Sequence, residues 1–301
     1  GATTGWPVSD WLEDGLLAIH GTGAYDQWAS HDVPVDAPVA VSTLDSLDSL
    51  LLAKGHVAGG RAGAVSMTME EAGAELVSGA CLMLHASSSF ETVLPPGTTV
   101  TDADGAHGVT VSASPTEAAS TSDGQPTSGS QPGDGSQPPS EGAADEARTA
   151  APASPATATA TPVRTGGVVS AFLLPAVETD STSNPVLVGG DYLVALKASN
   201  AATAVMSYLT SPVWAQTRLS LGGVASANHG VDAAGASSPV AQEASRILQS
   251  RQSVVRIDAS DMMPSAVGTQ VMWGALTKWA RGEASSVAAL AAAEAAWPKN
   301  G

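Results

Sequence analysis

The chain has 301 residues, of which 43% are hydrophobic, and a formal net charge of -17 at pH 7 with only 12 lysines and arginines. This length and hydrophobic content suffice for one large or two ordinary folded domains, whereas the charge argues against nucleic acid and anionic lipid as partners. The single cysteine, Cys81, excludes an intrachain disulfide, and no apolar run approaches the roughly 18 residues of a membrane span.

The first part of the chain is predicted to be mainly helical. Apolar spacing predicts helices over residues 10–20, 39–54 and 69–78, the second of which ends at Gly55. The segment "YDQWASHDVPVDAP" between the first two is expected to be irregular. The apolar run "ACLMLH" after the third is predicted to be a buried strand.

Residues 97–166 differ sharply in composition from the rest of the chain. Ser, Thr, Pro, Gly and Ala dominate this stretch, and it contains no aromatic residue. Such a segment cannot bury enough apolar surface to offset the entropy of ordering it, so we expect it to be disordered. It is interpreted as a tolerated surface insertion, the alternative being a long flexible tether.

After this insertion we predict two strands, followed by five helices. The strands are "VVSAFLLPAV" and "NPVLVGGDYLVALK", the second broken at Gly189-Gly190. The helices are predicted over residues 199–209, from 212 onward, from 239 to about 250, over 273–281 and over 285–297. The fold class is therefore α/β.

The order of several segments resembles the extracellular solute-binding proteins of sugar ABC importers. The segments are "TGWPVSDWLED", "GAYDQW", "HDVPVDAP", "MEEAGAELVSGACLML", "FLLPAV", "NPVLVGGDYLVALKAS", "AATAVMSYLTSPVWAQ", "GGVASANHGVD" and "IDASDMMPSAVG". Within that family they are most similar to the branch that takes oligosaccharides and α-glucosides. The resemblance covers nearly all of the chain outside residues 97–166.

The resemblance implies a periplasmic-binding-protein type II-like fold, in which two lobes joined by a hinge close on the sugar. Most of the N-terminal lobe has no counterpart in this sequence, which is expected to be N-terminally truncated. The resemblance assigns most of the chain to the C-terminal lobe: residues 1–96 are its first part, 167–187 its strand and the approach to the hinge, and 239–301 its final part. Residues 97–166 are the disordered low-complexity insertion. Residues 188–238 are the return segment of the N-terminal lobe.

The start of the first predicted helix carries the first pair of candidate ligand-binding residues. A sugar needs an aromatic face for its C–H-rich side and short polar groups for its hydroxyls. Trp6 and Asp10 supply one of each. The alternative interpretation makes Trp6 a hydrophobic staple and Asp10 a helix N-cap.

The other candidates depend on the family resemblance. Gly189, Gly190 and Asp191 match the family's hinge segment, which lines the cleft, although a glycine pair in a strand also marks a simple bend. Ser89 lies where many sugar binders carry an aromatic residue, so a stacking role is not expected there. Trp273 matches a position where related binders place a sugar-facing tryptophan, the alternative being packing against Leu276.

These observations predict a binding protein without catalysis. No G-x-S-x-G, H-E-x-x-H or Walker motif is present, and we expect neither a metal nor a cofactor. The expected partners are a sugar ligand and ABC permease subunits, with no nucleic acid, and the protein is expected to be a monomer. It is expected to be extracellular or periplasmic and anchored as a lipoprotein. The alternatives are a surface scaffold or adhesion protein of this fold and a divergent glycosidase.

The truncation itself leads to one structural expectation. The helices over residues 199–219 would lack the N-lobe strands on which they normally pack. We therefore expect them to expose Val205, Met206, Leu209 and Trp214.

Overall fold

The structure is a computed structural model that describes residues 5–102, 108–110, 167–175, 177, 185–190 and 193–299. All of them belong to one compact unit of the chain, residues 1–113 with 163–301.

Of the four N-terminal helices three were predicted, although the second ends at Leu50 rather than at Gly55, and the helix over Gly60–Ser66 was not predicted. Helix α1 (Trp6–Ala29) is longer than predicted and includes the start of the segment expected to be irregular, with a kink at Gly21, whose φ is 74°. Helix α2 spans Pro38–Leu50, α3 Gly60–Ser66 and α4 Met69–Ser78. A capping box formed by Thr68 and Glu71 begins α4, which satisfies two backbone donors that the first turn otherwise leaves free.

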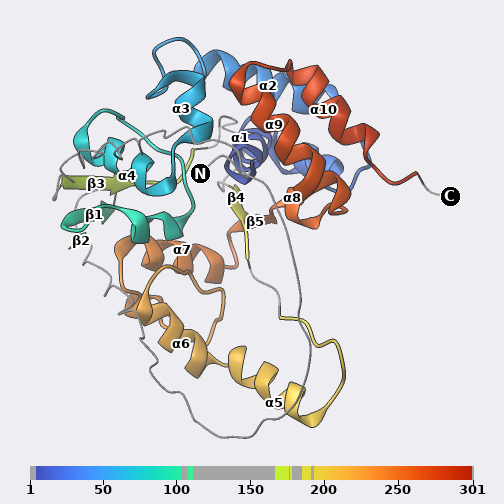
Figure 1. The fold of residues 1–301 in the computed structure, drawn as a ribbon. Helices are drawn as coiled ribbons and strands as arrows, with labels where there is room; N and C mark the ends of the chain where they lie inside the picture. Colours follow the sequence, from blue (N-terminus) through green and yellow to red (C-terminus); the bar gives the residue numbers. More distant parts are fainter. Residues whose placement is uncertain are drawn as a thin grey trace, which may run out of the picture. The chain divides into compact units, whose positions relative to one another are not determined.

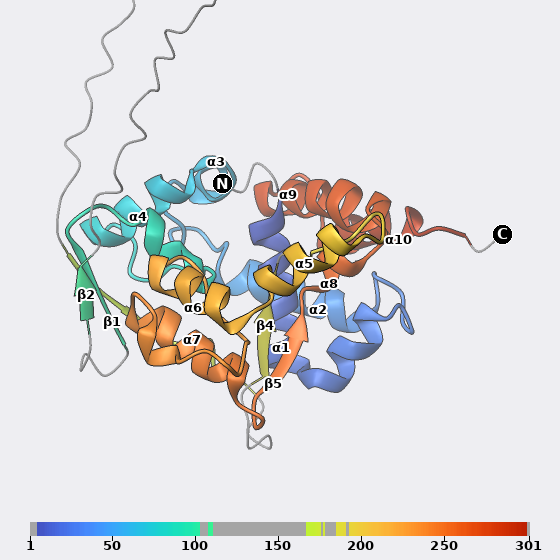
Figure 2. The ribbon, with the colours of Figure 1, turned by 90° about the horizontal axis from the view of Figure 1, so that it is seen from below.

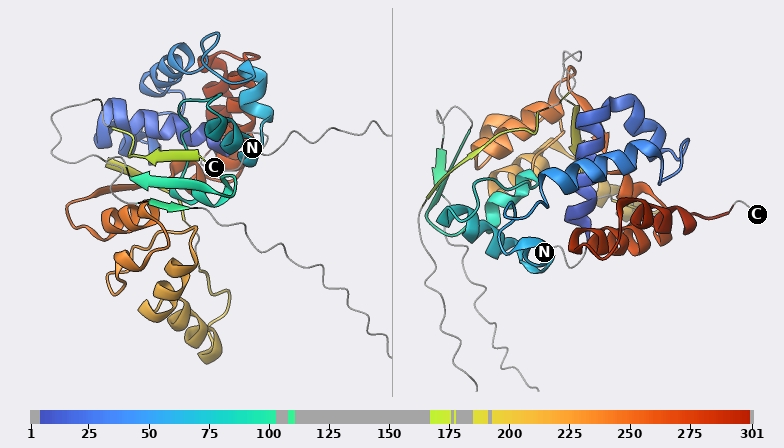
Figure 3. Two further views of the ribbon diagram at one scale, coloured as in Figure 1. Left: turned by 90° about the vertical axis from the view of Figure 1, so that its left-hand side faces the viewer. Right: turned by 90° about the horizontal axis from the view of Figure 1, so that it is seen from above.

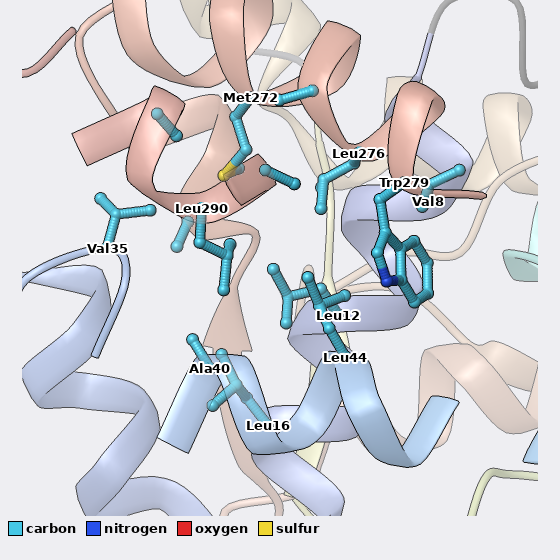
Figure 4. Close-up of a cluster of buried hydrophobic side chains, with 14 of the residues drawn as sticks. Val8, Leu12, Leu16, Val35, Ala40, Leu44, Met272, Leu276, Trp279 and Leu290 are labelled. Carbon is cyan, nitrogen blue, oxygen red and sulfur yellow. The ribbon is translucent and has the colours of Figure 1, made fainter. Parts of the chain in front are cut away.

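The C-terminal helices pack against α1 and α2 and form the main core (Figure 1). They are α8 (Ala259–Met262), the π-helix η3 (Ala266–Met272), α9 (Trp273–Arg281) and α10 (Ser286–Ala295). Figure 4 shows Leu12 and Leu44 pointing toward Leu276 and Leu290, all four completely buried. The first and last thirds of the chain therefore fold on each other, and each leucine contributes about 2 kcal/mol by leaving water.

Two small sheets lie beside this core. One has the order β2-β1-β3, with β1 (Thr98–Asp102) antiparallel to β2 (Gly108–Thr110) and parallel to β3 (Gly167–Ala171). Helix α7 (Pro239–Gln249) and the 3-10 helix η1 (Ser88–Val93) contact each other, and α7 lies against β1 (Figures 2 and 3). The other sheet pairs β4 (Pro185–Val188) in parallel with β5 (Val254–Ile257).

Two strand predictions and one part of the predicted disordered segment need correction. The run "ACLMLH" is not a strand, and Leu82 is 90% exposed rather than buried, because no strand in the described part of the chain lies beside it to share hydrogen bonds. The strand predicted over "VVSAFLLPAV" ends at Ala171. Residues 98–102 are strand β1 and not disordered, because β3 and β2 pair with them on both sides. The rest of the predicted insertion, apart from β2, lies outside the described residues.

Helices α5 (Asn200–Leu209) and α6 (Pro212–Leu221) start at the predicted caps, Ser199 and Ser211-Pro212. No residue of α5 is buried. Val205 is exposed, as expected, whereas Met206, Leu209 and Trp214 are half-buried. A short 3-10 helix, η2 (Ala233–Gly235), follows. Of the helices that the structure describes, none combines the length and hydrophobicity needed to span a bilayer.

Candidate functional site

The candidate site lies where β4 and β5 end. Parallel strands finish at the same edge of their sheet, and here Val188 pairs with Ile257, while the backbone N–H of Asp258 donates to the carbonyl of Val188 at 2.9 Å. Gly189 and Gly190 therefore leave the sheet beside Asp258. A Cβ atom added to either glycine would meet no atom within 4 Å, so this edge has open space around the backbone.

Asp258 connects this edge to α1. Its Oδ1 accepts hydrogen bonds from the Ser260 hydroxyl at 2.8 Å and from the Asp261 N–H at 3.2 Å, so it caps α8. It also forms a side-chain hydrogen bond with Asp10. Asp258 thus holds together two segments almost 250 positions apart in the chain.

The environment of Asp10 favours its protonated form. Burial is the main cause that raises the pKa of Asp10 to about 8, and the charges of Asp258, Asp14 and Asp261 add to it, as does the hydrogen bond with Asp258. Burial disfavours a charged carboxylate, and a second carboxylate nearby disfavours it further. Near neutral pH Asp10 therefore acts as a hydrogen-bond donor and Asp258 as an acceptor.

Two serines and two tryptophans complete the cluster. Ser260 Oγ lies 3.3 Å from Ser9 Oγ, and the Ser9 hydroxyl donates to the Trp6 carbonyl at 2.8 Å. The Trp273 indole N–H points to Ser260 Oγ at 3.4 Å. Trp6 and Trp273 are both half-buried, so part of each residue remains accessible. We call Trp6, Ser9, Asp10, Asp258, Ser260 and Trp273 the candidate site.

A glycine allows α1 and α9 to meet at the candidate site. Gly5 has a φ of 90°, and a Cβ atom there would lie 2.5 Å from both the Cβ and the carbonyl oxygen of Trp273. Replacing Gly5 with alanine is expected to lower the free energy of unfolding by about 2 kcal/mol, from backbone strain and from the displacement of Trp273.

Urea unfolding of Gly5→Ala measures this loss, and Gly60→Ala is the matched control. Gly60 also has a left-handed φ, 64°, but a Cβ atom added there would meet no atom within 4 Å. The control should therefore lose only the strain, about 1 kcal/mol. Equal losses in the two variants would show that the contact with Trp273 does not matter.

Beneath the candidate site, Glu13 is completely buried. Its Oε2 accepts hydrogen bonds from the Tyr25 hydroxyl at 2.7 Å and the Ala259 N–H at 2.5 Å, and its Oε1 accepts one from the Ser260 N–H at 3.0 Å. Burial raises the pKa of Glu13 well above its ordinary value, with the charge of Asp258 acting in the same direction, while the bonds from Tyr25 and Ala259 oppose it. Each carboxylate oxygen has a donor, which compensates for the cost of burial.

Most of the predicted site residues lie around Asp258 and Ser260. Asp10 and Trp273 join the cluster through their side chains and Trp6 through its backbone carbonyl, and Gly189-Gly190 leaves the sheet next to it. Asp10 is not an N-cap, because α1 begins four residues earlier, after Gly5. Trp273 begins α9.

Two predicted site residues do not join the cluster. Ser89 lies in η1, where its hydroxyl bonds to that of Ser87 at 2.8 Å, and no described contact links it to the candidate site. Asp191 lies outside the described residues. Conversely, the sequence analysis did not include Ser260 or Asp258 among the candidate residues. The one available signal was a short polar run, "DASD", after an apolar segment.

The candidate site offers hydrogen-bond donors, acceptors and indoles rather than a catalytic set. Among the described residues no group of histidine, cysteine and carboxylate side chains could hold a metal ion. Histidine does occur nearby, where His85 Nε2 contacts Asp14 Oδ2 at 2.7 Å and its ring lies 4.1 Å from that of Trp11. That pair joins residues 81–87 to α1. The arrangement suits recognition of a polar molecule that carries hydroxyl groups.

Comparison with known proteins finds two distant relatives. The chain is 24% identical over 301 residues to the osmoprotective compounds-binding protein GgtB of Synechocystis sp., which covers 99% of this chain and 55% of that protein. It is 29% identical over 107 residues to the alpha-glucosides-binding periplasmic protein AglE of Rhizobium meliloti, which covers 35% of this chain and 23% of that one. Neither a family model nor a solved structure matches the chain.

Both relatives are binding proteins by name and neither is named as an enzyme. The chain spans about half the length of the first relative. Together with the mixed helices and strands of the structure, these relatives fit a periplasmic-binding-like fold.

Proposed function

We propose that this chain carries much of the ligand-binding part of a solute-binding protein for a sugar ABC importer. The solute is a neutral oligosaccharide or α-glucoside, captured without chemical change. The observation that carries the proposal is the convergence of Asp10, Asp258, Ser260 and Trp273 at the edge where β4 and β5 end. The names of the two relatives support the same class of function.

In this proposal each side chain of the candidate site has a defined role. The indoles of Trp6 and Trp273 offer flat apolar faces to the C–H side of a sugar ring. Asp10, whose proton goes to Asp258, accepts a hydrogen bond from a sugar hydroxyl, and Asp258 and Ser260 accept further ones. The candidate site contains two carboxyl groups and no cationic side chain, so the arrangement favours a ligand without an anionic group.

The remainder of the mechanism follows from a two-lobed fold. The open backbone at Gly189-Gly190 is the hinge crossing to a second lobe, and Asp191 belongs to the same crossing. Ligand contacts on both lobes favour the closed state, which is then delivered to permease subunits. We further propose that the protein works as a monomer, outside the cytoplasmic membrane, with a lipid anchor.

A divergent glycosidase is the weaker alternative. The paired carboxyl groups of a glycosidase flank the bond they cleave, at a separation of about 5 Å or more. Asp10 and Asp258 instead share a hydrogen bond, which leaves no room for a glycosidic bond between them.

Saccharide binding tests the proposal directly. Maltose, sucrose and trehalose should each be titrated into the protein while tryptophan fluorescence is followed, and at least one should produce a saturable change. Replacing Trp273 with alanine should weaken that affinity about tenfold, the equivalent of about 1.4 kcal/mol of lost stacking.

Trp297→Phe serves as the control, because Trp297 stacks on His31 with ring centroids 3.7 Å apart and neither residue belongs to the candidate site. Its affinity should match that of the wild type. The proposal is wrong if no saccharide produces a response in the wild type.

A further inference from the structure

Glu13 has no place in ligand contact, because it has no exposed surface. A buried carboxyl group is costly to maintain, and its presence in an otherwise apolar face of α1 calls for a physical reason. Its two oxygens accept the backbone N–H groups of Ala259 and Ser260, as well as the hydroxyl of Tyr25. Glu13 therefore acts on the backbone of one short turn.

In that turn, residues 257–261, side chains accept three successive backbone N–H groups. The first N–H groups of a helix have no partner inside the helix. In α8 the N–H groups of Ala259 and Ser260 go to Glu13, and that of Asp261 goes to Asp258. The Tyr25 hydroxyl, which donates to Glu13, also lies 2.8 Å from the carbonyl of Ile257. A helix of four residues cannot hold this geometry by itself, so α1 imposes it.

The same turn carries the polar groups of the candidate site. Asp258 and Ser260 are the residues that bond to Asp10 and to the Trp273 indole. On the other side η3 closes on the turn at Gly268, where a Cβ atom would overlap the Ser260 carbonyl oxygen. The backbone of Ser260 is thus fixed between Glu13 and η3.

We propose that Glu13, with Tyr25, is a positioning residue of the ligand site, which sets Asp258 and Ser260 at the distance from Asp10 and Trp273 that a bound sugar requires. This inference rests on the proposed function. Two buried side chains, those of Glu13 and Tyr25, then determine the affinity of the site without touching the ligand.

The test compares ligand affinity with stability in matched variants. Glu13→Gln keeps the shape of the side chain but presents an NH2 group where three donors converge, so one of the bonds to the turn is lost. Leu290→Ala is the control. Leu290 is completely buried in α10, so its replacement should destabilise the protein without altering the turn. Each variant is titrated with the saccharide that binds the wild type, well below its own midpoint of thermal unfolding.

We expect Glu13→Gln to bind at least tenfold more weakly than the wild type, and Leu290→Ala to bind with unchanged affinity although it unfolds at a lower temperature. Glu13→Gln with wild-type affinity would overturn the inference, as would equal weakening in the two variants. If Glu13→Gln does not fold, Tyr25→Phe tests the inference instead. This variant retains both N–H bonds to Glu13 and should bind the saccharide about threefold more weakly than the wild type. An unchanged affinity of Tyr25→Phe would overturn the inference.

Failure of the proposed function gives a different result. In that case the wild type and Leu290→Ala bind none of the saccharides, and no affinity exists to compare. A saccharide that binds the wild type and the control equally, with Glu13→Gln and Tyr25→Phe unaffected, leaves the proposed function standing and removes only the positioning role.

Discussion

Replacing Asp10 with asparagine is expected to stabilise the fold at pH 7.5 by about 3 kcal/mol, although Asp10 belongs to the candidate site. In the folded state, burial and three neighbouring carboxylates raise the pKa of Asp10 from 3.8 to about 8. The full shift corresponds to at most about 6 kcal/mol, and local rearrangement and entering water reduce that limit. Asparagine carries no charge to bury and keeps an N–H donor for Asp258.

The sign of the pH dependence follows from proton binding. Between pH 3.8 and about 8 the folded protein keeps a proton on Asp10 that the unfolded chain has released. The free energy of unfolding therefore falls as pH rises through this window. Below it both states are protonated, and the contribution disappears. The advantage of Asp10→Asn should accordingly be close to zero at pH 4, grow up to pH 8 and stay constant above that.

Urea unfolding of the two proteins at half-unit intervals of pH measures this difference. Asp32→Asn is the control, because Asp32 is exposed at the end of α1 and its carboxylate accepts a bond from the nearby Ser30 hydroxyl, at 2.9 Å. Its curve should run parallel to that of the wild type. A constant offset between Asp10→Asn and the wild type from pH 4 to pH 8 would show that Asp10 is not protonated in the folded protein.

The helices were predictable because their limits depend on neighbouring residues. Thr68 and Glu71 form the capping box of α4, Ser199 caps α5, and Gly282 ends α9 in a left-handed conformation. Each of these signals operates within four residues of the helix end and is visible in the sequence. The limits of α4 and α9 agree with the prediction to the residue.

The strands were not predictable to the same degree, because a strand depends on its partner. "ACLMLH" is as apolar as a buried strand, but no strand lies beside it in the described part of the chain. The polar, threonine-rich β1 is a strand because β2 and β3 flank it. Strand β5 was overlooked, since its four residues gain a pattern only through pairing with β4.

The candidate site shows the same division between local and distant information. Trp6 and Asp10 lie four positions apart on α1, and their chemistry can be recognised in the sequence. Ser260 is the link that was missed, because its role arises from contacts with Ser9 and Trp273 that only the tertiary fold creates. Glu13 gives no signal as an acidic residue near other acids, and only its burial shows that it bonds to the start of α8.

Replacing Trp28 with alanine is expected to cost about 4 kcal/mol of unfolding free energy, the largest loss we predict for a single substitution. Trp28 has no exposed surface, and its indole N–H donates to the Val35 carbonyl at 3.0 Å. Alanine leaves a cavity between the end of α1 and the following loop and removes the donor for that carbonyl. Trp28→Phe fills most of the volume and loses only the hydrogen bond, so it should cost about 2 kcal/mol.

Thermal and urea unfolding of both variants measure these losses. Leu82→Ala is the control, because Leu82 is 90% exposed and its removal should change stability by less than about 0.5 kcal/mol.

The Trp28 ring also lies 6.3 Å from that of Tyr25, whose hydroxyl bonds to Glu13. A cavity at Trp28 therefore frees Tyr25 to move, and saccharide affinity should fall together with stability in Trp28→Ala but not in Leu290→Ala. Loss of stability at Trp28 without any loss of affinity would mean that the core and the ligand site are independent.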